Sequence, residues 1–324
     1  MSHHLLITGG TGFVGRALLR CWPESEIRCI RPTILTRNPQ RFAHQHPELA
    51  LRADWVIGDV LEPTSLSQSR PFANILHAAA DSTRGDRLSA FERFDQIVSG
   101  TRNILDFAVA NGARRVLIIS SGGVYGRQPS HLNTIPEDYM GMPDPMSTTN
   151  AYGVGKRVAE HLGALYAERY GLEVIVARCF TFVGQDLPLD VHFAIGNFIR
   201  DALWSKEITV KSDGSAVRSY MDQRDLAHWL TALLTRGESG QAYNVGSDRS
   251  ISVRDLAHLV RDVVSPGKPV KILGAAVGNF ERIRYVPDIR KAQVNLGLTS
   301  FFTLEQSIRD AAEAAQIIPP ENIL

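Results

Sequence analysis

The stretch ITGGTGFVG, residues Ile7–Gly15, carries three glycines in the spacing G-x-x-G-x-x-G. The apolar run His3–Thr8 leads into it as an expected strand, and Phe13–Trp22 follows with the apolar spacing of a helix. Small residues here let the backbone approach a diphosphate, and the helix N-terminus offers unpaired N–H groups and partial positive charge. An ordinary strand-to-helix turn is the alternative. We predict a dinucleotide-binding loop, with contacts from Gly9, Thr11, Gly12, Phe13 and Val14.

Strand and helix patterns continue to alternate through the first half of the chain. Strands are expected at 29–36, 55–58, 74–80, 116–120 and 172–178, and helices at 91–111 and 151–170. These strands are apolar along their length, which is typical of a parallel sheet covered on both faces. After residue 184 the pattern is less regular, with helices expected at 196–204, 222–235, 253–264 and 304–315, and a strand at 243–246. We predict an α/β fold: a Rossmann-type doubly wound parallel sheet over residues 1–184, and a smaller C-terminal α/β lobe over 185–324, with some exchange of chain between them.

Composition excludes several classes of protein. The chain has 324 residues and a formal net charge of +1, without the basic excess that nucleic-acid binding usually shows. No apolar run approaches the roughly 20 residues of a membrane span, and the N-terminus does not resemble a signal peptide. The three cysteines have no metal-ligand spacing. We expect a cytoplasmic protein with reduced thiols, no metal site, and no nucleic-acid or membrane partner.

Several residues are candidates for binding the rest of the dinucleotide. The second expected strand ends in ILTRNP, which offers Arg37 and no carboxylate. A guanidinium suits the 2′-phosphate of NADP, so NADP is favoured over NAD, although Arg37 could be a solvated surface cation. Asp59 could accept a hydrogen bond from the adenine amino group, and Val60 follows it. Ala78, Ala79 and Ala80 end the fourth strand with small side chains, which suit a backbone beneath a cofactor or a tightly packed core.

Tyr152 and Lys156 lie four residues apart in NAYGVGK, so a helix places them on one face. A phenol is a weak base because its pKa is near 10, and a neighbouring ammonium favours the phenolate. Ser121, in SSGGVYG after the 116–120 strand, could hold a substrate oxygen beside Tyr152. These three residues are the expected catalytic set for hydride transfer.

TGGTGFVG, SSGGVYG and YGVGK together resemble the extended short-chain dehydrogenase/reductases, and more narrowly the nucleotide-sugar epimerases, dehydratases and ketoreductases. The resemblance implies a Ser121–Tyr152–Lys156 triad in contact with the cofactor, and a structural or cofactor-facing Ser120. It also implies a homodimer formed through the helices at 91–111 and 151–170. For the substrate, it implies that Arg218 contacts the diphosphate and that Asn197 and Thr181 contribute polar contacts.

The chain departs from this family at three places. Its dehydratases carry an Asp-Glu pair directly after the triad hydroxyl and its decarboxylases usually a Glu, whereas this chain has Gly122 and Gly123. Thr181 stands where Asn is frequent, and the late Arg falls on Gly278, with Arg282 or Arg284 as substitutes. We therefore expect a 4-epimerase or 4-ketoreductase acting on a nucleoside-diphosphate sugar, with dehydration and decarboxylation less expected. A reductase of a non-nucleotide ketone or alcohol and a non-catalytic NADP-binding regulator are the alternatives.

Overall fold

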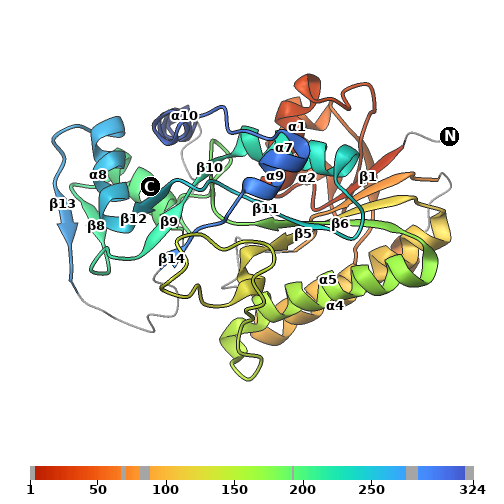
Figure 1. The fold of residues 1–324 in the computed structure, drawn as a ribbon. Coiled ribbons are helices and arrows are strands. Elements are labelled where there is room, and N and C mark those ends of the chain that lie inside the picture. The colour runs from red at the N-terminus through yellow and green to blue at the C-terminus, as the bar shows by residue number, and fades with distance from the viewer. Residues whose placement is uncertain (1–3, 67–70, 81–87, 192, 275–283, 318–324) are drawn as a thin grey trace.

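A seven-stranded parallel sheet forms the centre of the computed structural model, which describes residues 4–66, 71–80, 88–191, 193–274 and 284–317 (Figure 1). The strand order is β11-β6-β5-β4-β1-β2-β3. In chain order the strands are β1 (Leu5–Thr8), β2 (Thr33–Thr36), β3 (Asp54–Ile57), β4 (Asn74–His77), β5 (Arg115–Ser121), β6 (Glu173–Cys179) and β11 (Ala242–Val245). The order reverses between β1 and β4, which is where such sheets bind ligands at the carboxyl ends of their strands. The predicted Rossmann-type fold is confirmed.

Helices cover both faces of this sheet. The helices α1 (Phe13–Cys21) and α7 (Gln223–Arg236) pack together on one face, and α4 (Ala90–Asn111) and α5 (Ala151–Tyr170) pack together on the other (Figure 1). Each face has its own core, because alternate strand residues point in opposite directions. Because two helices cover each face of the sheet, side chains on both sides of the central strands are buried, and these strands are almost wholly apolar.

Two strands are shorter than the sequence predicts. The second was expected from Cys29, but β2 begins at Thr33, after a 3₁₀ turn at Trp22–Glu24 and a bend that ends at Pro32. Proline has no N–H for the sheet, so the strand starts beyond it. The fourth was expected to run to Ala80, but β4 ends at His77. Ala78–Ala80 therefore form the loop above the carboxyl end of the sheet.

A third core lies in the smaller lobe, mostly among elements that follow residue 184. The helices are α6 (Ala194–Trp204), α8 (Val253–Val264) and α10 (Leu304–Ile317), and the strands are β8 (Ile208–Val210), β9 (Val217–Ser219), β12 (Ser250–Ser252), β13 (Val270–Ile272) and β14 (Arg284–Tyr285). A parallel pair, β7 (Phe182–Val183) and β10 (Met221–Asp222), connects this lobe to the sheet. Because α7 and β11 return to the main sheet, the lobe exchanges chain with it. The division at residue 184 stays a prediction.

Three short helices were not predicted: α2 (Pro39–Gln45), α3 (Pro47–Ala50) and α9 (Arg290–Leu296). The first two begin at prolines, which fit the first turn of a helix. Across the described part of the chain, no helix combines the length and apolarity that a membrane crossing requires.

Candidate active site

The glycine loop joins β1 to α1 in a conformation that side chains could not occupy. Gly9 has φ +71°, and a Cβ there would lie 2.4 Å from the carbonyl oxygen of Ala78. A Cβ on Gly15 would lie 2.2 Å from the backbone of Gly10. Gly12 is the exposed N-cap of α1, and its added Cβ would meet only the Gly9 oxygen, at 3.4 Å. The first turn of α1, with Thr11, Phe13 and Val14 partly exposed, therefore fits a dinucleotide diphosphate.

A buried hydrogen-bonded chain fixes the strand ends beneath this loop. The Thr8 hydroxyl lies 2.8 Å from His77 Nδ1, and His77 Nε2 lies 3.2 Å from the Thr101 hydroxyl. Since Thr101 donates to the Ile97 carbonyl, Nε2 carries the proton and Nδ1 accepts from Thr8. Burial, aided by the charge of Lys156, lowers the pKa of His77 to about 3. The imidazole is therefore neutral and structural.

The predicted adenosine contacts lie at the ends of β2 and β3. Arg37 is 77% exposed on its side chain, and one guanidinium nitrogen lies 3.7 Å from Asp59 Oδ2. Asp59 also accepts from the amide of Leu61, and Val60 is buried. A cation and a carboxylate therefore stand side by side at this edge of the sheet, so the edge offers both a phosphate partner and a hydroxyl partner.

The predicted triad meets where β5 and α5 approach each other. Lys156 is buried and donates from Nζ to the Ile119 carbonyl at 2.7 Å, which places its ammonium 5.9 Å from the centroid of the Tyr152 ring. Ser121 ends β5, and its Oγ accepts from the amide of Gly123 at 3.1 Å. Burial lowers the pKa of Lys156 to about 8. The lysine is therefore mostly charged at pH 7, close to the phenol.

The start of α5 packs closely against the turn that follows Ser121. A Cβ on Gly153, the residue after Tyr152, would lie 2.7 Å from the Gly123 carbonyl oxygen. The helix can approach the turn only because position 153 has no side chain. No sequence motif pointed separately to this role of Gly153.

A buried polar network lies behind the triad. Ser120 donates to Glu160, which forms an ion pair with Arg178 at 2.8 Å. Arg178 also donates to the Tyr125 hydroxyl at 2.9 Å, and Tyr125 donates to Asn244 at 2.8 Å. Burial alone would lower the pKa of Arg178, but the hydrogen bond and the charge of Glu160 outweigh it, so the pKa is raised. Ser120 therefore has a structural partner, and sequence reasoning did not identify the ion pair that holds it.

The predicted substrate residues lie on the lobe side of the sheet. Arg218 is half-buried on β9, where it pairs with Ile251 of β12 and Tyr285 of β14. The Thr181 hydroxyl donates to the carbonyl of Ser219, the residue after Arg218. The Asn197 side-chain oxygen, on α6, accepts from Arg200 at 3.0 Å. Thr181 and Asn197 thus also have partners within the protein.

Of the three positions considered for the late arginine, only Arg284 lies among the described residues. Gly278 and Arg282 lie outside the described residues, and Arg284 donates to the carbonyl of Asn133 at 3.3 Å.

Gly122 has no room for a larger side chain. A Cβ there would lie 2.6 Å from the Tyr285 hydroxyl and 2.7 Å from the Phe180 ring. These two rings pack against each other in a tilted arrangement, with centroids 4.5 Å apart. An aromatic pair therefore fills the space where the family's dehydratases and decarboxylases place an acidic residue, and sequence analysis did not identify either ring.

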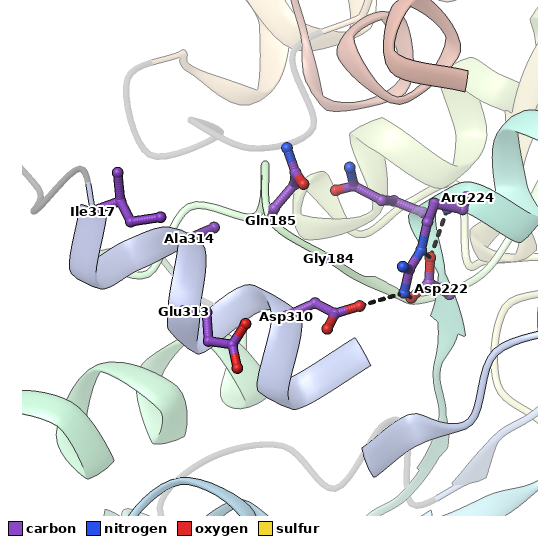
Figure 2. A pocket seen from close by; sticks show the side chains of 9 residues that line it. Gly184, Gln185, Asp222, Arg224, Asp310, Glu313, Ala314 and Ile317 are labelled. Carbon is purple, nitrogen blue, oxygen red and sulfur yellow. Dashed lines mark hydrogen bonds and ion pairs between the residues drawn. The ribbon is translucent and has the colours of Figure 1, made fainter. Parts of the chain in front are cut away.

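A cavity of about 390 Å³ lies elsewhere, between α10, the start of α7 and the loop after β7 (Figure 2). Arg224 lies 2.7 Å from Asp222 and 2.7 Å from Asp310, so its charge is balanced by two carboxylates (Figure 2). The lining contains none of the predicted cofactor, catalytic or substrate residues. No cluster of potential metal ligands occurs among the residues that the structure describes.

Comparison with known proteins agrees with this geometry. Residues 5–246 match the NAD dependent epimerase/dehydratase family. The chain belongs to this family. It is 30% identical to UDP-glucuronic acid decarboxylase 1 of Xenopus tropicalis, over 94% of this chain and 70% of that protein. The predicted family resemblance is confirmed, and the protein is an enzyme of a nucleotide-sugar family. This relative is a decarboxylase, whereas the glycines at positions 122 and 123 had made decarboxylation the less expected activity for this chain.

Solved structures share the fold. UDP-glucuronic acid 4-epimerase from Bacillus cereus, in complex with UDP-glucuronic acid and NAD, superposes with a TM-score of 0.81 at 21% identity, covering 97% of this chain and 99% of that one. RMD from Pseudomonas aeruginosa, complexed with NADPH, gives 0.76 at 24% identity, covering 97% and 98%. Family membership makes this protein NAD(P)-dependent, and both cofactor forms occur among its structural neighbours.

Proposed function

We propose that this enzyme transfers a hydride at a secondary alcohol or ketone of a nucleoside-diphosphate sugar, as a 4-epimerase or a 4-ketoreductase. The observation that carries the proposal is the joint geometry at the end of β5. Lys156 lies 5.9 Å from the Tyr152 ring centroid, Ser121 ends β5 one residue before Gly122, and position 122 is closed to an acid by Tyr285 and Phe180. The acidic residue that the family's dehydratases and decarboxylases carry is absent from both position 122 and position 123.

Each catalytic residue has a distinct role. When bound, the nicotinamide dinucleotide supplies the acceptor or donor of the hydride. Tyr152 takes the proton from a sugar hydroxyl during oxidation, or gives a proton to the ketone oxygen during reduction. Ser121 donates a hydrogen bond to that same oxygen and orients it. Lys156 stabilises the phenolate of Tyr152, because a unit charge about 6 Å away contributes roughly 3 kcal/mol at an effective dielectric constant near 20.

Arg218 is proposed to bind the substrate diphosphate from β9. Its guanidinium fork matches phosphate oxygens. The Thr181 bond to Ser219 fixes the strand that carries it. Asn197 is proposed as a further polar contact, from the start of α6. The sugar of a substrate anchored this way extends from β9 toward Ser121, where Tyr285 links the two regions.

Product analysis tests the reaction type. Purified protein is incubated with UDP-glucuronic acid or UDP-glucose and either NAD or NADP, and the products are followed by proton NMR. We expect a 4-epimer that keeps all its carbons, or, in a second incubation that supplies a nucleoside-diphosphate 4-keto sugar and NADPH, reduction of that ketone to the alcohol. A UDP-pentose with released CO₂ as the main product would contradict the proposal. A thermal-shift series with UDP, dTDP, GDP and CDP completes the test, because no stabilisation by any of them points to a non-nucleotide ketone.

The preference for NADP is also proposed, on the charge of Arg37. Arg37→Ala should weaken NADPH binding about tenfold more than NADH binding, because only NADPH carries the 2′-phosphate. Arg102→Ala, an exposed arginine on α4, is the matched control. Equal loss for the two cofactors, or tighter binding of NADH by the unmodified protein, would refute the preference.

A homodimer through α4 and α5 is proposed from the family resemblance. Phe91 on α4 and Leu165 on α5 expose 79% and 45% of their surface, and such residues are expected to be covered by a partner. Light scattering of the purified protein and of Leu165→Glu tests this. A monomeric mass for the unmodified protein rejects the dimer.

A further inference from the structure

One arginine of α1 joins two segments that are distant in the sequence. Arg16 donates from Nε to Asp186 Oδ1 at 3.1 Å and from a terminal nitrogen to the Asp186 carbonyl at 2.9 Å. Its other terminal nitrogen donates to the carbonyl of Thr11 at 3.0 Å. Thr11 belongs to the glycine loop, and Asp186 lies in the loop after β7. We call this set of bonds the Arg16–Asp186 bridge.

The bridge acts on the peptide bond that leads into α1. The carbonyl of Thr11 is held by Arg16, and the N–H of the same peptide, on Gly12, donates to the Gly9 carbonyl at 3.0 Å. A peptide bonded at both ends cannot rotate. The amides that follow it, in the first turn of α1, are the groups expected to face the cofactor diphosphate. Their direction is therefore set before any ligand arrives.

Asp186 is itself firmly placed. Its side chain is 4% exposed and also accepts from Arg20 Nε at 2.9 Å. Gln223, the first residue of α7, accepts from the Asp186 amide and donates to its carboxylate, both at 3.0 Å. Gln223 also lines the cavity shown in Figure 2, so one residue that holds Asp186 borders that cavity. Burial disfavours the charged carboxylate, but the two arginines outweigh it and lower the pKa of Asp186.

We propose that Arg16 and Asp186 are positioning residues that preset the glycine loop for the cofactor diphosphate, through the Thr11 carbonyl. Arg20 also lies 3.8 Å from Glu48, so the two arginines are balanced by two carboxylates and the bridge acts through its geometry and not through a net charge. The loop that carries Asp186 follows Thr181 and β7, so the bridge ties the cofactor half of the site to the strand pair that supports Arg218. The role concerns cofactor binding and does not depend on which nucleotide sugar is the substrate.

Cofactor and nucleotide affinities test the bridge separately. Calorimetric Kd values are measured for NAD, NADP and UDP with the unmodified protein, Arg16→Gln and Asp186→Asn. We expect Arg16→Gln to raise the dinucleotide Kd about tenfold while the UDP Kd changes less than twofold. Arg52→Gln is the matched control, because Arg52 donates to the carbonyls of Leu19 and Arg20 at the far end of the same helix. It should leave the dinucleotide Kd unchanged even where it lowers Tm.

Two further variants distinguish positioning from simple charge. Arg16→Lys keeps the charge, but its single nitrogen cannot reproduce the three bonds that three separate guanidinium nitrogens make, so it should bind dinucleotide nearly as weakly as Arg16→Gln. Full affinity in Arg16→Lys would overturn the proposal. In a double-mutant cycle, Arg16→Gln with Asp186→Asn should be no weaker than the weaker single variant, because both act through one bridge. Additive losses, or equal losses for UDP and dinucleotide, would also overturn it.

Discussion

Lys156→Met should make the enzyme slower and its stability less dependent on pH. The ammonium of Lys156 lies 5.9 Å from the Tyr152 ring centroid. At an effective dielectric constant near 20, its loss removes roughly 3 kcal/mol of phenolate stabilisation. Such a loss corresponds to about a hundredfold fall in kcat at pH 7. Steady-state kinetics measures it, with the nucleotide sugar that the product analysis under Proposed function shows to be turned over.

The stability effect follows from the burial of the same charge. Burial lowers the pKa of Lys156 from 10.5 to about 8, so the unfolded chain binds a proton that the folded protein releases between these values. A buried ammonium therefore destabilises the fold fully below pH 8, and this cost disappears as the pH rises toward 10.5. From pH 7 to 9.5 the parent protein should gain about 2 kcal/mol relative to Lys156→Met. The bond to Ile119 is lost at every pH and only shifts the baseline.

Urea denaturation at pH 7, 8, 9 and 9.5 measures this difference. Lys211→Met, a change at an exposed lysine, controls for general effects of removing a charge. The reasoning fails if the stability difference between parent and Lys156→Met is the same at all four values. It also fails if the variant keeps more than about a tenth of the parent kcat, because loss of the ammonium is expected to lower kcat about a hundredfold.

Three other changes have defined outcomes. Tyr152→Phe removes the proton carrier and should lower kcat by about 10³-fold, with dinucleotide Kd unchanged by calorimetry; parent-like turnover would exclude the phenol as acid/base. Gly9→Ala places a Cβ 2.4 Å from the Ala78 carbonyl oxygen at φ +71°, so thermal shift should show no stabilisation by dinucleotide, and retained stabilisation would contradict the loop assignment. Glu160→Leu leaves Arg178 buried without its carboxylate and should cost about 3 kcal/mol of unfolding free energy in urea, and a loss below about 1 kcal/mol would show that the pair is solvated.

The contrast between this chain and its decarboxylase relatives centres on Gly122. The glycine is not simply a missing side chain, because Tyr285 and Phe180 fill its place. Placing an acid at position 122 therefore requires two changes, one at Gly122 and one at Tyr285, because a single large side chain would displace the aromatic pair.

The architecture, and the parts of the site that lie close together in the chain, could be predicted from the amino-acid pattern alone. Apolar strands in alternation with helices predicted the parallel sheet, since burial on both faces leaves no polar alternation. Gly9, Gly12 and Gly15 predicted the loop, and Tyr152 with Lys156 predicted one helical face, because both patterns depend only on local geometry. The start of β2 and the carboxyl end of β4 were predicted wrongly, by four and three residues.

The distant residues that complete the site could not be predicted, because they come together only in the folded chain. Arg16 and Asp186 are 170 residues apart, and Gly122 and Tyr285 are 163 apart, so no local periodicity relates them. They meet because crossover helices return each strand to one sheet and bring the carboxyl ends of the strands to one edge. Side-chain chemistry can be read from the sequence, but contacts across such an edge depend on packing, and packing is a property of the folded chain.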